Sequence, residues 1–290
     1  MKDVRYLAPA TIPEAVQLLG EYGQDTMIVA GGTDAMVDLT LGRVQPPTYL
    51  MYIGNIREMD YVREDSGTIR IGALTTYRTL GRSRLLWDKA TALAEIAVDI
   101  AAPPIQNLAT LGGNIVRASP AGDSIPPLLV LEATVTLVGP GGSRQVPLDQ
   151  FFTGPGQTVR AEDELLTEIS FPVPGERTVS MFIRQGKRKA LYLSVASASV
   201  CLTLVPGDGI CEDARIALGA VAPTPIRARE AEKRLIGQPF DPGVIKAVAQ
   251  TAVAESRPID DGRASAWYRR QITDVLVRRA LRGARERIED

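Results

Sequence analysis

Residues 30–34 read Ala-Gly-Gly-Thr-Asp, and residues 110–114 read Thr-Leu-Gly-Gly-Asn. Each glycine pair follows a hydrophobic or helical stretch, at a point where a loop is expected. A glycine pair removes two Cβ atoms and permits positive φ angles, so that successive backbone N–H groups can converge on an anion such as a diphosphate. Two such loops predict a dinucleotide held from both sides. Taken alone, the first loop is equally well explained as a strand-to-helix turn without a ligand.

The glycine spacing excludes two common nucleotide-binding motifs. No Gly-Lys-Ser/Thr follows the first pair, so it is not a P-loop. No G-x-G-x-x-G occurs, so there is no Rossmann fingerprint. A dinucleotide site in this chain therefore requires a different fold.

Composition is that of an ordinary globular protein. The 290 residues are enough for two domains, 45% of them are hydrophobic, and the net charge of −1 gives no basic field for nucleic acid. No uncharged apolar run reaches the length of a membrane span, and residues 1–5 do not resemble a signal peptide. A cytoplasmic location, with no membrane span and no nucleic-acid partner, is expected.

The chain contains no histidine and two cysteines, Cys201 and Cys211. A histidine base, a four-thiolate iron–sulfur cluster and an ordinary zinc site are therefore excluded, and no metal-ligand set is assigned. The cysteines can flank one hairpin, where thiols are favoured over a disulfide in the cytosol. Chemistry must come from a cofactor, carboxylates, hydroxyls, lysine or tyrosine.

Local patterns predict an alternation of helices and strands. Thr11, Pro13 and Gly23 delimit a first helix over 13–22. Residues 172–175, Pro-Val-Pro-Gly, mark a domain boundary. The other predicted elements are strands at 26–30, 49–53, 61–63, 68–71, 132–138, 143–146, 179–183, 193–205 and 210–220, and helices at 90–100, 225–236, 242–254 and 264–288.

The second glycine loop continues through a further turn at 119–123. Asn114 offers an amide to a carbonyl, a ring nitrogen or a phosphate. Asp123 either accepts hydrogen bonds from ribose hydroxyls or caps the helix that starts near Pro126.

These motifs together resemble the FAD-binding medium subunit of the molybdenum hydroxylases, the xanthine dehydrogenase and carbon monoxide dehydrogenase family. The resemblance covers nearly the whole chain. The segments that carry it are 30–34, 110–114, 118–123, 146–154, 163–166, 268–270 and 277–281.

The resemblance implies an α+β, vanillyl-alcohol-oxidase (PCMH)-type FAD-binding fold. Residues 1–174 form the FAD-binding domain, with subdomains at about 1–55 and 56–174, and residues 175–290 form a smaller α+β domain with an antiparallel sheet and helices. It implies that FAD is bound non-covalently by Val29, Ala30, Gly31, Gly32, Thr33, Asp34, Ala109, Thr110, Gly112, Gly113, Asn114, Val116, Gly122, Asp123, Leu165, Leu166, Arg184, Lys187 and Tyr192. No catalytic residue is assigned.

The last three of these positions come from a looser match. The family often has an acidic residue before the tyrosine, where this chain has Leu191. Tyr192 is equally an ordinary strand aromatic, and Arg184 and Lys187 are equally members of a solvated loop. A cation near the flavin N1–C2=O edge would stabilise the reduced ring.

The implied function is electron transfer within a heteromeric enzyme. The molybdenum cofactor and 2Fe-2S clusters would lie on a large and a small partner, in a dimer of heterotrimers, and NAD, a quinone or oxygen would be the acceptor. The alternatives are a self-contained FAD-dependent oxidase or reductase and a non-catalytic nucleotide-binding protein.

We expect FAD to be released completely by acid precipitation. Covalent flavin attachment commonly uses histidine or cysteine; the chain has no histidine, and both cysteines belong to the hairpin predicted beyond the glycine loops. The absorption of the supernatant near ~450 nm measures the release, because that band belongs to the cofactor. Yellow colour retained in the washed pellet would contradict the expectation.

Overall fold

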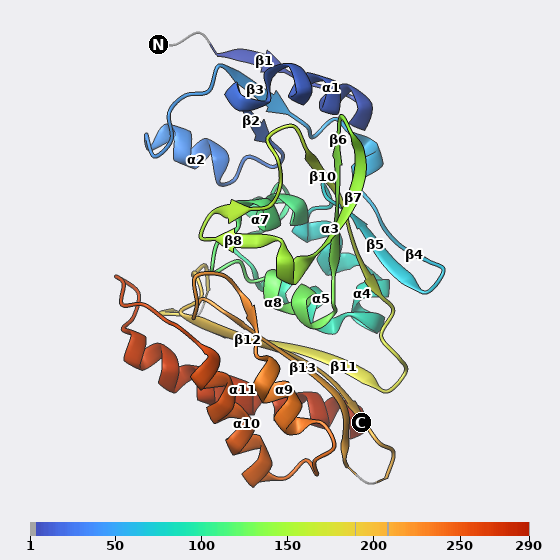
Figure 1. Cartoon of the computed structure of the whole chain (residues 1–290), viewed down its shortest axis with the longest axis vertical. Helices are drawn as coiled ribbons and strands as arrows, with labels where there is room; N and C mark the ends of the chain where they lie inside the picture. Colours follow the sequence, from blue (N-terminus) through green and yellow to red (C-terminus); the bar gives the residue numbers. More distant parts are fainter. Residues whose placement is uncertain (1–3, 189, 208, 290) are drawn as a thin grey trace.

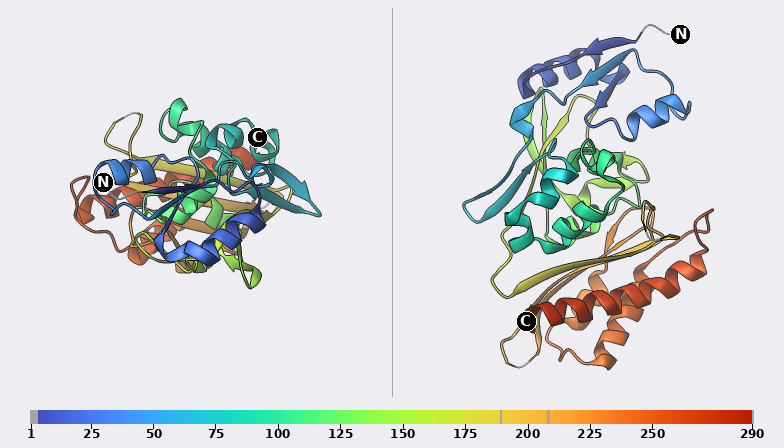
Figure 2. Two further views of the ribbon diagram at one scale, coloured as in Figure 1. Left: turned by 90° about the horizontal axis from the view of Figure 1, so that it is seen from above. Right: turned by 180° about the vertical axis from the view of Figure 1, so that it is seen from behind.

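The computed structural model describes residues 4–188, 190–207 and 209–289. Three layers follow one another along the long axis, with the N-terminal sheet at the top and the C-terminal sheet and helices at the bottom (Figures 1 and 2). Its mixed helix and sheet content agrees with the predicted α+β class.

The N-terminal layer is a parallel sheet of three strands in the order β1-β3-β2. These are β1 (Arg5–Leu7), β3 (Tyr49–Tyr52) and β2 (Thr26–Val29), accompanied by α1 (Ile12–Tyr22), η1 (Gly23–Asp25) and α2 (Ala35–Thr40). The Thr11 hydroxyl accepts the N–H of Glu14 at the start of α1, as its capping role predicts. Strand β2 leads directly into the first glycine pair.

The middle layer is an antiparallel sheet in the order β4-β5-β10-β6-β7. The strands are β4 (Val62–Asp65), β5 (Thr68–Gly72), β10 (Leu165–Pro172), β6 (Thr134–Gly139) and β7 (Gly142–Pro147), with a small hairpin of β8 (Phe152–Gly154) and β9 (Gln157–Thr158). The helices are α3 (Tyr77–Arg82), α4 (Arg84–Lys89), α5 (Thr91–Asp99), α6 (Pro103–Gln106), α7 (Leu111–Arg117) and α8 (Ile125–Val130), with η2 (Arg57–Met59) and η3 (Leu148–Gln150). The strand expected from residue 132 begins at Thr134, because Glu132 has a φ of 57° and belongs to the turn.

The C-terminal layer is an antiparallel sheet in the order β11-β12-β13-β14. Its elements are β11 (Thr178–Gln185), β12 (Ala196–Leu204), β13 (Cys211–Gly219), β14 (Ile226–Arg227), α9 (Arg229–Leu235), α10 (Pro242–Glu255) and α11 (Ala266–Glu289). The helix expected from residue 225 begins at Arg229, because Ile226 and Arg227 pair with β13. Helix α11 packs on β11 and β12, and α8 packs against the same sheet from the middle layer.

Partly buried arginines join the middle and C-terminal layers. Arg227 donates to the carbonyl of Leu129 at 3.1 Å, and Arg215 donates to that of Val130 at 3.3 Å. These carbonyls lie in the last turn of α8, where cations are favoured.

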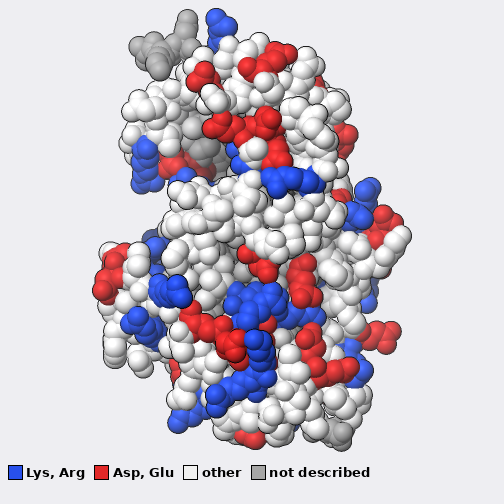
Figure 3. All heavy atoms as spheres, in the orientation of Figure 1, with Lys and Arg blue, Asp and Glu red and all other residues white. Residues whose placement is uncertain are grey.

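Opposite charges intermingle over the lower half of the molecule in Figure 3, without a large field of one sign on that face.

None of the described helices combines the length and the apolar character that crossing a bilayer requires.

Cys201 and Cys211 are buried free thiols on the two strands of the β12–β13 hairpin, which confirms the thiol interpretation. Burial raises the pKa of Cys201 to about 11 and that of Cys211 to about 12. The reactive thiolate is therefore scarce in the folded protein below these values.

We expect the native protein to react with Ellman's reagent at pH 8 much more slowly than after unfolding in guanidinium. Unfolding exposes both thiols and returns their pKa to about 8.5, so both then react quickly. Glutathione at the same pH is the control for reagent activity. Rapid modification of either cysteine in the native protein would contradict the buried hairpin.

Candidate functional site

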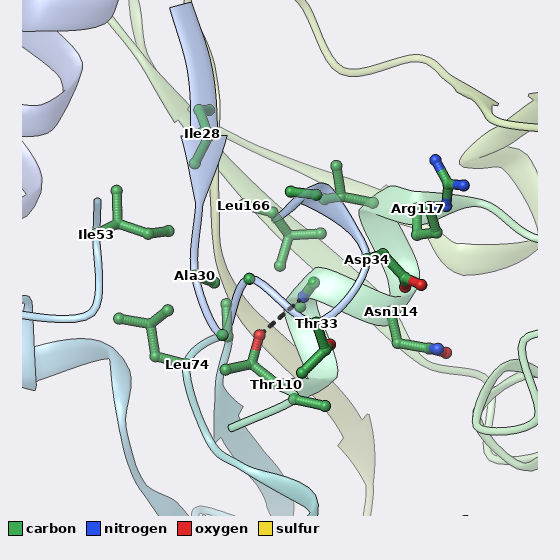
Figure 4. Close-up of a pocket in the computed structure, with 18 of the residues that line it drawn as sticks. Ile28, Ala30, Thr33, Asp34, Ile53, Leu74, Thr110, Asn114, Arg117 and Leu166 are labelled. Carbon is green, nitrogen blue, oxygen red and sulfur yellow. Dashed lines mark hydrogen bonds between the residues drawn. The ribbon is translucent and has the colours of Figure 1, made fainter. Parts of the chain in front are cut away.

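A cavity of about 590 Å³ lies between the N-terminal and middle layers. Figure 4 shows an apolar side containing Ile28, Ile53 and Leu166, and a polar side containing Thr33 and Asn114. The volume falls within the range of about 300–1,000 Å³ that is common for small-molecule sites, which are mostly apolar with a few placed polar groups.

The first glycine pair forms a tight loop on the cavity wall. Gly32 has a φ of 71°, the left-handed conformation that glycine tolerates. A Cβ on Gly31 would overlap the carbonyl oxygen of Leu108, so the loop packs directly on the backbone just before the second motif. Among the described residues, none accepts a hydrogen bond from the backbone N–H groups of residues 31–34. The loop therefore has unpaired donors beside a cavity, which fits an anionic group.

The second glycine pair is not a loop. Gly112 and Gly113 occupy the first turn of α7, and neither has a positive φ. The N–H of Gly112 donates to the carbonyl of Ala73 at 2.9 Å, and that of Gly113 donates to the Thr110 hydroxyl at 3.1 Å. The prediction of a second set of converging free donors is therefore wrong, because Thr110 caps a helix whose Leu111 is buried.

The glycines of α7 instead allow close packing. A Cβ on Gly112 would lie 2.6 Å from the Cβ of Ala73, so a side chain there would push α7 away from the segment after β5. Gly113 is exposed, and its Cβ would lie 2.9 Å from the Thr110 hydroxyl. A substitution at Gly113 would thus disturb the helix cap rather than strain a left-handed residue.

Most of the predicted site residues line this one cavity. They are Ala30, Gly31, Gly32, Thr33, Asp34, Ala109, Thr110, Gly112, Gly113, Asn114, Val116, Leu165 and Leu166. Val29 is buried at the end of β2, directly before the loop. The residues predicted from the later motifs, Gly122, Asp123, Arg184, Lys187 and Tyr192, are not part of the cavity wall.

Asp123 is buried and paired with Arg184. Its carboxylate accepts hydrogen bonds from the Arg184 guanidinium at 2.6 Å and from the Ser194 hydroxyl at 2.6 Å. The helix-cap interpretation of Asp123 is wrong, since Ser124 is the N-cap residue of α8 and no side chain there makes a capping bond. Lys187 donates to the carbonyl of Gly262, and the Tyr192 ring lies beneath the guanidinium of Arg184. Contact between these residues and a flavin stays a prediction.

The sequence interpretation missed several wall residues, including Tyr77, Ile100, Ala101, Gln106, Arg117, Arg160 and Leu193. Arg117 stands one helical turn after Asn114, so reading 111–117 as a helix would have placed both on one face. Ile100, Ala101 and Leu193 carry no local signal, because tertiary packing alone brings their segments to the cavity.

The charged side chains of the described cavity wall are two arginines, Arg117 and Arg160, and two aspartates, Asp34 and Asp38. Arg117 pairs with Asp38 at 2.9 Å, and Asp38 also lies 3.4 Å from Arg43. Arg160 donates to the carbonyls of Ala161 and Glu164, and burial lowers the pKa of its guanidinium. Burial also raises the pKa of Tyr77, whose hydroxyl donates to Ser124. Among the titratable groups of the described wall, Asp34 is the carboxylate without an ion-pair partner.

Residues 2–174 match the family model "FAD binding domain in molybdopterin dehydrogenase", and residues 181–284 match "CO dehydrogenase flavoprotein C-terminal domain". The chain belongs to this family of FAD-binding subunits. The expected family and fold are thereby confirmed, and FAD is the cofactor that the cavity suits.

Related proteins cover almost all of the chain. The carbon monoxide dehydrogenase medium chain of Hydrogenophaga pseudoflava is 33% identical over 96% of both chains, and the nicotinate dehydrogenase FAD-subunit of Eubacterium barkeri is 34% identical over 83% of this chain and 82% of that one. A solved structure of carbon monoxide dehydrogenase from Hydrogenophaga pseudoflava superposes with a TM-score of 0.94, at 36% identity and 98% coverage of both chains.

We expect Gly32→Val to weaken FAD binding at least about tenfold, because a β-branched residue disfavours the left-handed conformation and would crowd the loop. Gly42→Val is the matched control: Gly42 also has a positive φ, of 65°, but no atoms lie close to its Cβ position and it is not in the cavity wall. Flavin content and a fluorescence titration measure binding, and circular dichroism checks folding. Wild-type affinity in a folded Gly32→Val protein would contradict the assignment of this loop.

Proposed function

We propose that this chain is the FAD-carrying electron-transfer subunit of a heteromeric molybdenum-containing dehydrogenase. It receives electrons from iron–sulfur clusters on a partner chain and passes them to an external acceptor, such as NAD, a quinone or oxygen. The partners are a large subunit with the molybdenum cofactor and a small 2Fe-2S subunit, arranged as a dimer of heterotrimers. Residues 1–174 bind FAD, and residues 175–290 form the second domain.

The cavity wall supports this proposal, because its side chains and backbone donors suit cofactor binding better than substrate conversion. The free N–H groups of residues 31–34 and the guanidinium of Arg117 provide donors for a diphosphate. Of the two carboxylates on the described wall, Asp38 is committed to Arg117 and Arg43, and Asp34 belongs to the donor loop at 31–34 itself. A substrate-converting oxidase would need a placed acid or base in addition to the flavin.

The residues of this chain would bind and orient FAD. The loop at 31–34 and Arg117 would hold the phosphate groups, and the apolar side containing Leu165 and Leu166 would pack against a ring system. When bound, FAD supplies the ability to exchange both one and two electrons. That ability suits a connection between one-electron clusters and a two-electron acceptor.

The sequence makes partner chains necessary for the full reaction. Two cysteines cannot hold a four-thiolate cluster. The names of the relatives, "medium chain" and "FAD-subunit", are those of multi-chain enzymes. They support assembly with partners, whereas the acceptor has to be identified by experiment.

We expect the assembled complex, once depleted of FAD, to keep reducible iron–sulfur centres and to lose acceptor reduction. Limiting dithionite reduces the complex, which is then mixed rapidly with NAD⁺, a water-soluble quinone or oxygen. Dithionite should still bleach the absorption of the iron–sulfur clusters. The rate of acceptor reduction should fall at least about tenfold, because the flavin cofactor transfers the electrons to the acceptor.

Adding FAD back to the depleted complex is the control, and it should restore acceptor reduction. Unchanged reduction of all three acceptors without flavin would overturn the electron-exit role. Conversion of an organic substrate by the purified chain alone would favour the self-contained oxidase.

A further inference from the structure

Arg184, at the end of β11, has a side chain that is only 4% exposed. One terminal nitrogen lies 2.6 Å from the carboxylate of Asp123, which is equally buried. A buried guanidinium and carboxylate stabilise each other, and removing one leaves the other uncompensated. Arg184 is therefore anchored to the loop between α7 and α8.

The same guanidinium also holds the end of α5. Its Nε lies 2.9 Å from the carboxylate of Asp99, and its second terminal nitrogen donates to the Asp99 carbonyl at 2.7 Å. The next two residues, Ile100 and Ala101, line the FAD cavity. Ala101 has a φ of 50°, an unfavourable conformation that persists only where surrounding contacts impose it.

A third set of contacts holds the segment 191–194, which we call the strap. The Tyr192 ring lies 4.3 Å from the Arg184 guanidinium carbon, and a Cβ on Gly186 would overlap that ring. Ser194 donates to the second oxygen of Asp123 at 2.6 Å. Leu193, between these two anchored residues, lines the cavity although it is 64% exposed.

We propose that Arg184 is a positioning residue that clamps two parts of the cavity wall, residues 100–101 and Leu193, and so limits the escape of bound FAD. Packing does not hold the leucines of the strap, because Leu193 is 64% exposed and Leu191 is 48% exposed. The contacts of the two residues that flank Leu193 depend on Arg184, directly for Tyr192 and through Asp123 for Ser194. Arg188 also donates to the carbonyl of Leu191, at the start of the strap. This inference rests on the cavity being the FAD site.

The chain contains a matched control for loss of an interdomain arginine. Arg287 on α11 pairs with Glu95, one turn before Asp99 on the same helix α5, and donates to the Ser180 carbonyl at 3.3 Å. Arg287 and Glu95 are not in the cavity wall. Arg287→Met removes a contact between the same two layers and leaves the contacts of the strap in place.

The test measures the rate of FAD release from holoprotein, by recovery of free flavin fluorescence after dilution. Arg184→Met should release FAD at least about tenfold faster than wild type, whereas Arg287→Met should stay within about twofold. Arg184→Lys should fall between them, since one ammonium keeps the charge but cannot bridge both carboxylates. Leu193→Ala should itself speed release.

A double-mutant cycle identifies the route of the effect. In the Leu193→Ala background, Arg184→Met should add less than about threefold, because coupled residues are not additive. Equal release rates for Arg184→Met and Arg287→Met would overturn the clamp, and so would fully multiplicative effects of Arg184→Met and Leu193→Ala.

Two further variants guard against loss of folding. If Arg184→Met does not fold, Arg184→Lys and Gly186→Ala replace it, because an added methyl at Gly186 displaces Tyr192 while leaving Arg184 intact. Wild-type release rates in both would overturn the clamp. If wild-type protein does not hold FAD at all, the assignment of the cofactor fails instead, so the two failures are distinguishable.

Discussion

The close contact of the first glycine motif with the backbone just before the second is the constraint on which the cavity depends. Gly31 lies so near the carbonyl of Leu108 that no side chain fits between them, and Gly112 brings α7 close to Ala73 within the middle layer. The first approach joins the N-terminal loop to the middle layer at the cavity, and the second fixes the position of α7 in the cavity wall. The glycines are thus required by backbone packing as much as by the ligand.

The two motifs offer different numbers of free donors to an anion. The loop at 31–34 has free backbone N–H groups, whereas the N–H groups of Gly112 and Gly113 in the first turn of α7 already donate to Ala73 and Thr110. Positive charge is added by Arg117, whose direction is fixed by the buried Asp38. An arginine that is held by a carboxylate loses less freedom when it meets a phosphate.

Arginines also connect the C-terminal layer to the rest of the molecule. Arg215 and Arg227 reach the last carbonyls of α8, Arg287 reaches Glu95, and Arg184 reaches Asp99 and Asp123. Each guanidinium has several donors in a rigid plane and can join two or more segments at once. The C-terminal domain therefore does more than cover helices α5 and α8 of the middle layer, since the strap supplies part of the cavity wall through Leu193.

The sequence by itself determined the types of most of the elements it predicted, the two glycine motifs and the absence of histidine, because helix caps, hydrophobic periodicity and composition are local properties. It predicted residues 30–34 and the leucines at 165–166 as parts of one site, and the structure brings these segments to one cavity. It did not determine that 111–117 is a helix, since a glycine pair favours a loop locally while Thr110 and the buried Leu111 stabilise a helix in the folded chain. Only the tertiary structure decided that Asp123 meets Arg184 and that residues 100–101 and Leu193 complete the cavity, because these contacts join segments far apart in the chain and leave no periodic signal in it.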